Sequence, residues 1–161
     1  MTQVGSQLTK SVSFHVACVP PKASHHAKRI VRIGQFSRLA DKPELVAAKA
    51  TLDALLLPHQ PAAPVGSDVP RRHYGGPVPV ALEVVYTWPW LASHSARVRA
   101  AGRVPMTSKP DLDNVTKSLI DRLMALRFIE DDSNVVDLHV RKFWGSEPGI
   151  SVVIRPFPVR F

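Results

Sequence analysis

The sequence predicts a single α/β (α+β) domain over residues 1–161, with a mixed β-sheet flanked by helices. Two observations carry this prediction. Short segments of strand composition lie toward both ends of the chain, and two longer segments between them repeat apolar residues at helical spacing. The resulting order is strand, strand, helix, strand, helix, strand, strand, which is typical of helices packed on a sheet. With 161 residues, 45% of them hydrophobic, the chain can bury a core.

The N-terminal half begins with a predicted strand over 11–19, where polar and apolar residues alternate. Prolines at 20–21 end this strand, and the basic segment 22–32 is expected to form a loop or a hairpin. Good helix formers fill 43–57, with leucines at helical spacing, so this helix should pack on the core. The segment 58–79 is rich in proline and glycine and is expected to be an exposed connection.

The C-terminal half contains the remaining predicted elements. Residues 80–88 have the β-branched and aromatic composition of a strand. Three arginines among small residues make 89–105 a predicted exposed, mobile, basic loop. Apolar residues along one helical face predict a helix over 113–126. Segments 135–144 and 150–154 then read as closing strands.

Composition and charge limit the classes of function that fit this chain. Lys and Arg number 21 against 13 Asp and Glu, a formal charge of +8 with a pI of about 10.2, which favours a polyanionic partner, although many basic proteins bind none. Cys18 is the only cysteine, which excludes an intrachain disulfide and a thiolate-rich zinc site. No apolar run has the length of a membrane span or signal peptide, so a cytoplasmic protein without a membrane partner is expected. The adjacent His25 and His26 could serve a metal or a proton shuttle, but adjacent histidines in a basic loop are more often solvated or in contact with phosphate.

The densest polar signal is the segment 109–114, which reads Lys-Pro-Asp-Leu-Asp-Asn. Proline disfavours helical backbone at the residue before it, so the segment is expected to be extended, with side chains two apart pointing the same way. Asp111 and Asp113 should then converge while Leu112 turns into the core. A cation between two such carboxylates relieves their repulsion, and Mg²⁺ prefers hard oxygen ligands of this kind.

Two further features belong to the candidate site. Asp131 and Asp132 reach it if the chain reverses after the helix predicted at 113–126. Lys117 follows Asp113 by four residues, so the two should share a helical face and the ammonium could reach the same phosphate. A metal, an activated water and a positioned cation are together what phosphodiester hydrolysis requires.

Each of these residues also has a structural explanation. Asp113 could cap the helix or form an ordinary ion pair with Lys117, and Asp111 could interact with the helix dipole. Asp131 and Asp132 could be turn residues. The functional interpretation rests on all of these residues occurring together in a basic chain.

Three motifs carry a resemblance to a known family. They are Lys-Pro-Asp-Leu-Asp-Asn-Val-Thr-Lys at 109–117, Glu-Asp-Asp-Ser-Asn-Val-Val at 130–136, and Arg-Lys-Phe-Trp at 141–144. Together they resemble the RusA-type family of Holliday-junction resolvases, crossover junction endodeoxyribonucleases often carried by prophages and phages. The resemblance spans most of the chain and is weakest at 58–77 and 91–102.

The resemblance implies a homodimeric α/β endonuclease that needs Mg²⁺, with Mn²⁺ as a substitute, and makes paired nicks across a four-way DNA junction in recombination or repair. It places the essential acids at Asp111, Asp113 and Asp132, with Asp131 as a neighbouring metal ligand, and the essential lysine at Lys117. No small-molecule cofactor is implied.

Basic residues scattered over the loops are expected to hold the DNA arms by their phosphates, without reading sequence. They are Lys22, Arg29, Arg97, Arg99, Arg103 and Lys109. Two alternatives stay open: a catalytically silent protein that binds branched DNA, and a looser nuclease that acts on flaps or forks.

Overall fold

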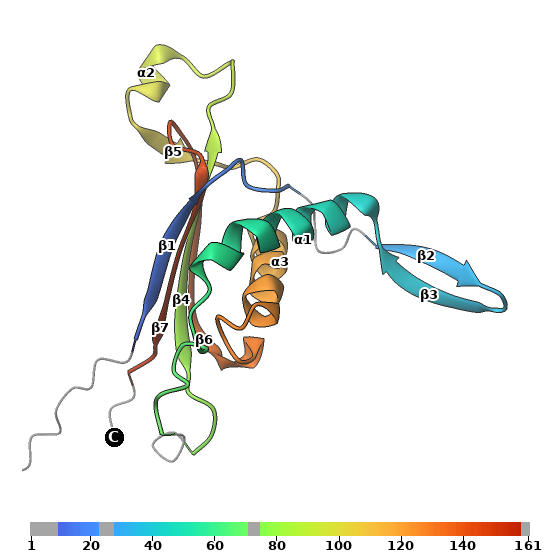
Figure 1. Cartoon of the computed structure of the whole chain (residues 1–161). Helices are drawn as coiled ribbons and strands as arrows, with labels where there is room; N and C mark the ends of the chain where they lie inside the picture. Colours follow the sequence, from blue (N-terminus) through green and yellow to red (C-terminus); the bar gives the residue numbers. More distant parts are fainter. Residues whose placement is uncertain (1–9, 23–27, 71–74, 159–161) are drawn as a thin grey trace, which may run out of the picture.

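The computed structural model describes residues 10–22, 28–70 and 75–158. A five-stranded sheet in the order β1-β7-β4-β6-β5 forms its centre, and helices α1 and α3 lie on one face of that sheet (Figure 1). Strand β4 pairs in parallel with β6 and antiparallel with β7, which confirms the predicted mixed sheet and α+β class. The elements are β1 (Val12–Ala17), β2 (Lys28–Ile33), β3 (Phe36–Asp41), α1 (Pro43–Leu56), η1 (Leu57–His59), β4 (Val80–Pro89), α2 (Ala96–Arg99), β5 (Arg103–Pro105), α3 (Leu112–Ala125), η3 (Asp132–Asn134), β6 (Val135–Gly145) and β7 (Gly149–Pro156).

The central strand β4 shows why the core lies on one side of the sheet. Leu82, Val84, Tyr86 and Trp88 alternate along it and are all buried, because side chains two apart on a strand share a face. The intervening side chains of β4, such as Glu83, are only half-buried. The buried face is the one that α1 and α3 cover.

Both long helices occupy the predicted segments. Helix α1 begins at Pro43, whose fixed φ suits the first helical turn, and α3 buries the apolar stripe that includes Leu119 and Leu123. Arg122 Nε of α3 lies 2.9 Å from Asp53 Oδ1 of α1, an ion pair whose atoms are not aligned for a hydrogen bond. Among the described residues, neither helix nor any other is long and apolar enough to span a membrane.

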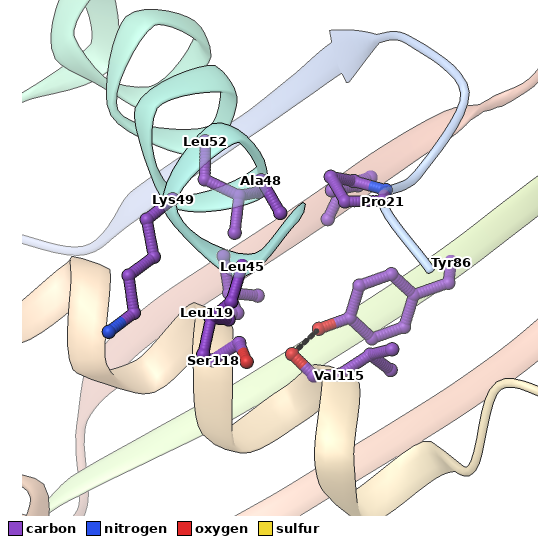
Figure 2. A pocket seen from close by; sticks show the side chains of 10 residues that line it. Pro21, Leu45, Ala48, Lys49, Leu52, Tyr86, Val115, Ser118 and Leu119 are labelled. Carbon is purple, nitrogen blue, oxygen red and sulfur yellow. Dashed lines mark hydrogen bonds between the residues drawn. The ribbon is translucent and has the colours of Figure 1, made fainter. Parts of the chain in front are cut away.

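A small cavity of about 10 Å³ lies between α1, α3 and the sheet (Figure 2). Apolar side chains, including Leu45 and Leu119, form most of its wall. A space of this size holds about one water-sized sphere and is too small for a substrate. The interior between the helices and the sheet is therefore core.

The two segments expected to be exposed loops are more structured than their composition indicates. The prediction for 58–79 is wrong for Val65 and Val78, which are buried, and the Val65 amide donates to the Phe128 carbonyl oxygen at 2.9 Å. The segment 89–105 is largely exposed, as predicted, but it is not a loop throughout, since it contains α2 and the edge strand β5. Both corrections have one cause: tertiary contacts to the core and to β6 order segments whose local propensity is weak.

Strands β2 and β3 form a separate antiparallel hairpin that projects from the N-terminal end of α1, away from the main sheet (Figure 1). The hairpin alternative for the basic segment is thus confirmed from Lys28 onward, although β3 was not predicted. Gly34 has a φ of +61°, which a two-residue hairpin turn with glycine first requires. Asp41 ties the hairpin base to α1 by accepting from Lys28 Nζ at 2.6 Å and from Lys49 Nζ at 2.5 Å.

Low pH is expected to weaken the Asp41 contacts that hold the base of the hairpin against α1. Hydrogen bonds from Lys28 and then Lys49 lower the pKa of Asp41 from 3.8 to about 2. A carboxyl group whose pKa is lower in the folded state stabilises the fold above its unfolded pKa and loses that effect as the pH falls toward the folded value. Amide exchange in β2 and β3 should therefore accelerate between pH 4 and pH 2 relative to the core, and Asp41→Asn should show the fast exchange already at neutral pH. Equal exchange in wild type and Asp41→Asn at neutral pH would contradict this anchoring role.

Candidate active site

The site residues gather around the start of α3. Asp111 occupies the N-cap position with extended backbone (φ −69°, ψ 138°), and the helix begins at Leu112, which packs against the core as predicted. The expectation that Asp111 and Asp113 belong to one extended segment is wrong, because Asp113 lies in the first helical turn. Side chains two positions apart on a helix diverge, so the spacing alone does not bring these two carboxylates together.

The carboxylates of Asp111 and Asp113 are both exposed to solvent. The Asp111 side chain forms no capping hydrogen bond and is 54% exposed, with Lys109 Nζ 3.9 Å from its Oδ2. Asp113 is exposed and forms no hydrogen bond or ion pair with any residue that the structure describes. Neither carboxylate therefore serves as a side-chain cap, and the proposed Asp113–Lys117 ion pair is not formed.

Lys142 of β6 fixes the segment that leads to Asp111. Its Nζ donates to the carbonyl oxygens of Ser108 and Pro110, both at 2.8 Å, and its own carbonyl oxygen accepts from the Met106 amide at 3.1 Å. Three hydrogen bonds to one residue thus hold 106–110 against the sheet. Sequence reasoning missed this role, although one signal was present: strand alternation assigns Lys142 to the helix-covered face, which also carries Trp144.

Tyr86 and Thr116 fix the first turns of α3 itself. The Tyr86 hydroxyl donates to the Val115 carbonyl oxygen at 3.3 Å, which Figure 2 shows as a link between β4 and α3. Burial raises the pKa of Tyr86, so this hydroxyl keeps its proton. Thr116 Oγ1 donates to the Leu112 carbonyl oxygen at 2.6 Å. The helix that presents Asp113 therefore has a defined position on the sheet.

Asp132 is brought to α3 by Lys117. The chain reverses after α3, as the site prediction required, and Lys117 Nζ lies 2.6 Å from Asp132 Oδ2 and 3.0 Å from Asp121 Oδ1. Hydrogen bonds to Asp132, and next to Asp121, raise the pKa of Lys117 from 10.5. Because the folded pKa is the higher one, the ammonium and its stabilising effect persist at neutral pH and are lost only at strongly alkaline pH. Asp121 was not identified from the sequence, although its i+4 spacing from Lys117 on a helix was a usable signal.

Asp131 has a clear local role. Its Oδ1 accepts from the Ser133 amide at 2.9 Å and from the Ser133 hydroxyl at 2.5 Å, which caps η3. These hydrogen bonds lower the pKa of Asp131. The turn-residue explanation therefore applies to Asp131, and its role as a metal ligand stays a prediction.

The chemistry of the available donors fits Mg²⁺. Among the described residues, no three Asp, Glu, His or Cys side chains are close enough to form a preformed metal cluster. Mg²⁺ does not require one, because it commonly takes one or two carboxylates and fills its other positions with water and substrate phosphate. The exposed carboxylates of Asp111 and Asp113 are hard oxygen ligands of this type, and Asp132 of η3 lies beside Lys117 of α3. Whether they share an ion stays a prediction.

The predicted DNA-binding cations fall into two groups. Lys22, Arg29, Arg97 and Lys109 are exposed, on four different segments. The other two, Arg99 and Arg103, have intramolecular contacts. Arg99 donates to the carbonyl oxygens of His94 and Leu91, and the Arg103 guanidinium stacks 4.6 Å from the centre of the Phe143 ring. The predicted role of His25 and His26 falls outside the described residues.

Comparison with known proteins gives a family match over the region that contains this site. The model of the family "Endodeoxyribonuclease RusA" matches residues 58–155, which includes α3, η3, β6 and every acid of the candidate site. An uncharacterized protein of Bacillus subtilis (strain 168), YqaN, is 40% identical over 89 residues, or 53% of this chain and 62% of that protein. The chain thus spans less than two thirds of the relative that it matches. Because the family match covers more than half of the chain, the protein belongs to the RusA endodeoxyribonuclease family.

Proposed function

We propose that this protein is a structure-specific endodeoxyribonuclease that resolves Holliday junctions by Mg²⁺-dependent phosphodiester hydrolysis. The observation that carries the proposal is that the region matched by the RusA family model holds two exposed carboxylates at the start of α3, Asp111 and Asp113, neither of which forms a capping hydrogen bond. Lys117 of the same helix pairs with Asp132 of η3. Exposed carboxylates close together in a chain of charge +8 favour metal-assisted chemistry on a polyanion.

Each residue has a distinct proposed task. Asp111, Asp113 and Asp132 would hold the metal ion, with Asp131 as a further oxygen ligand. When bound, Mg²⁺ supplies Lewis acidity that polarises the phosphate and activates the attacking water, and Mn²⁺ would serve the same purpose. Lys117 remains a cation at neutral pH and would stabilise the negative charge that grows on the phosphate.

Paired nicks imply two copies of the site. A four-way junction with two equivalent cleavage positions matches a protein with two-fold symmetry, and C2 homodimers are the commonest symmetric assemblies. We therefore include a homodimer in the proposal. Sedimentation of the junction complex should give two protein chains per junction.

Comparison of DNA substrates tests the proposed specificity. With Mg²⁺ present, the protein should nick a four-way junction at least about tenfold faster than a flap, a replication fork or a linear duplex of the same sequence. Equal rates on linear duplex would contradict junction resolution and indicate the looser nuclease. Tight junction binding without nicks in Mg²⁺ or Mn²⁺ would indicate the silent binding protein.

Lys142 is expected to act as a positioning residue for Asp111. Lys142→Met removes both hydrogen bonds to the carbonyl oxygens of 108 and 110, so the Mg²⁺ concentration that half-saturates nicking should rise by about tenfold, the lower range for lost support of a metal ligand. Junction affinity measured in chelator should change by less than about twofold, and Lys142→Arg should recover part of the metal affinity. An unchanged Mg²⁺ dependence in Lys142→Met would contradict this role.

A further inference from the structure

The β2–β3 hairpin displays an unusual amount of apolar surface. Four large apolar side chains on its two short strands are mostly solvent-exposed: Ile30 (71%), Ile33 (55%), Phe36 (73%) and Leu39 (68%). Its strands pair only with each other, and the hairpin projects from the rest of the fold (Figure 1). A lone two-stranded hairpin is marginally stable in water, so this surface is suited to a bound partner.

The charges on the hairpin identify the kind of partner. Arg29, Arg32 and Arg38 are exposed and form no ion pair or hydrogen bond with any other described residue. The single carboxylate of the hairpin, Asp41, is already engaged by Lys28 and Lys49. The hairpin therefore presents uncompensated positive charge beside its apolar side chains, which is complementary to a polyanion with apolar faces such as DNA.

The distribution of these side chains over two faces favours a groove over a flat surface. Strand alternation and the register Val31↔Arg38 and Ile33↔Phe36 place Arg29, Arg38 and Phe36 on one face of the hairpin, whereas Arg32 and Leu39 lie on the other. The DNA major groove, about 12 Å wide, admits a two-stranded β-ribbon and has phosphates along both walls. A ribbon with arginines on both faces can contact both walls at once.

A second copy of the chain is a poorer partner for the same surface. A two-fold interface brings a patch against its own copy, so two hairpins of the same positive charge would face each other. The only carboxylate on the hairpin is not free to compensate them. Such like-charge contacts cost free energy, whereas phosphates would remove the imbalance.

We propose that the β2–β3 hairpin is a DNA-binding arm that enters the groove of a DNA arm, with Arg29, Arg32 and Arg38 on phosphates and the Ile33–Phe36 tip against the bases. The hairpin lies outside residues 58–155, so the family match does not supply this site. The proposal rests on the proposed function only in its substrate, DNA. It assigns DNA contacts to residues 28–41, separate from the carboxylates that would do the chemistry.

The test measures junction binding in chelator, where no cutting can occur. The triple variant Arg29→Gln, Arg32→Gln and Arg38→Gln should bind a fluorescent four-way junction at least tenfold more weakly than wild type. The slope of log Kd against log salt should fall by about 0.9 for each lost phosphate contact. The matched control removes three exposed cations elsewhere, Lys10→Gln, Arg127→Asn and Arg155→Gln, and should weaken binding less than threefold.

The tip is tested separately. Phe36→Ala combined with Ile33→Ala should weaken binding about fivefold to tenfold, in the range of lost base–aromatic contacts, while leaving the salt slope unchanged because no counterion release is lost. Circular dichroism and thermal unfolding verify that the core is intact in every variant. A change in oligomeric state with unchanged DNA affinity would overturn the proposal and assign the surface to a second copy.

Parallel nicking assays separate this proposal from the proposed function. If wild type nicks junctions with Mg²⁺ but the arginine triple binds as tightly as wild type, the hairpin proposal fails and the nuclease stands. If the triple loses affinity while wild type binds without nicking, the hairpin proposal is supported and the nuclease proposal fails. If the control triple loses as much affinity as the hairpin triple, the contribution is general charge and the hairpin proposal is overturned.

Discussion

Replacing Asp113 by Asn is expected to lower the single-turnover rate of junction nicking by about a thousandfold, the upper range for loss of one electrostatic element of an active site. The substitution keeps the shape of the side chain but removes a negatively charged oxygen ligand. Since the Asp113 carboxylate is exposed and forms no hydrogen bond or ion pair with a described residue, the fold should be unaffected. Junction affinity in chelator should stay within about twofold of wild type.

A matched control uses Asp68, an exposed carboxylate in the connection before β4. Asp68→Asn makes the same chemical change away from α3 and should leave the nicking rate unchanged. If Asp113→Asn lost junction binding and thermal stability together with nicking, the carboxylate would be structural. Full nicking activity in Asp113→Asn would exclude it from the metal site.

Replacing Lys117 by Met is expected to reduce nicking by about a hundredfold, because it removes the cation proposed to face the transition-state charge. The loss should not result from unfolding. Lys117 and Asp132 are each more than 40% exposed, and exposed ion pairs contribute only about 0–1 kcal/mol to stability. Thermal unfolding should therefore change little while the rate falls steeply.

The conservative variant separates charge from shape. Lys117→Arg keeps a permanent cation and should recover part of the rate, without a change in junction affinity. The pH profile supplies a second readout: because its neighbours raise the pKa of Lys117, the wild-type rate should show no decline from loss of this proton between pH 7 and pH 9. A Lys117→Met enzyme with the wild-type rate would contradict the assigned role.

The helices and central strands were predictable because their signals are local. Leu119 and Leu123 recur along one face of α3, and the composition of β4 is that of a buried strand, so both elements appear within a residue or two of the prediction. Strand β5 was not predictable in this way. Its three residues have no strand pattern of their own and are ordered by pairing with β6.

The candidate site was likewise predictable only where its signals are local. The acidic motif was visible as a dense local cluster, but its backbone was not, because Pro110 restricts only the residue before it and the chain becomes helical from Leu112. The Lys142 and Asp132 contacts connect segments 15 or more residues apart, and sequence spacing does not encode such distances. The tertiary fold decides which of these side chains meet.

The proposed Mg²⁺-dependent resolution of Holliday junctions is tested most directly by incubating the wild-type protein with a synthetic four-way junction, with Mg²⁺ and with chelator. We expect symmetric, paired nicks in Mg²⁺, none in chelator, and restoration of nicking when Mg²⁺ or Mn²⁺ is returned. Tight binding of the junction with no nicks under either metal would contradict the claim, as would nicking that continues unchanged in chelator.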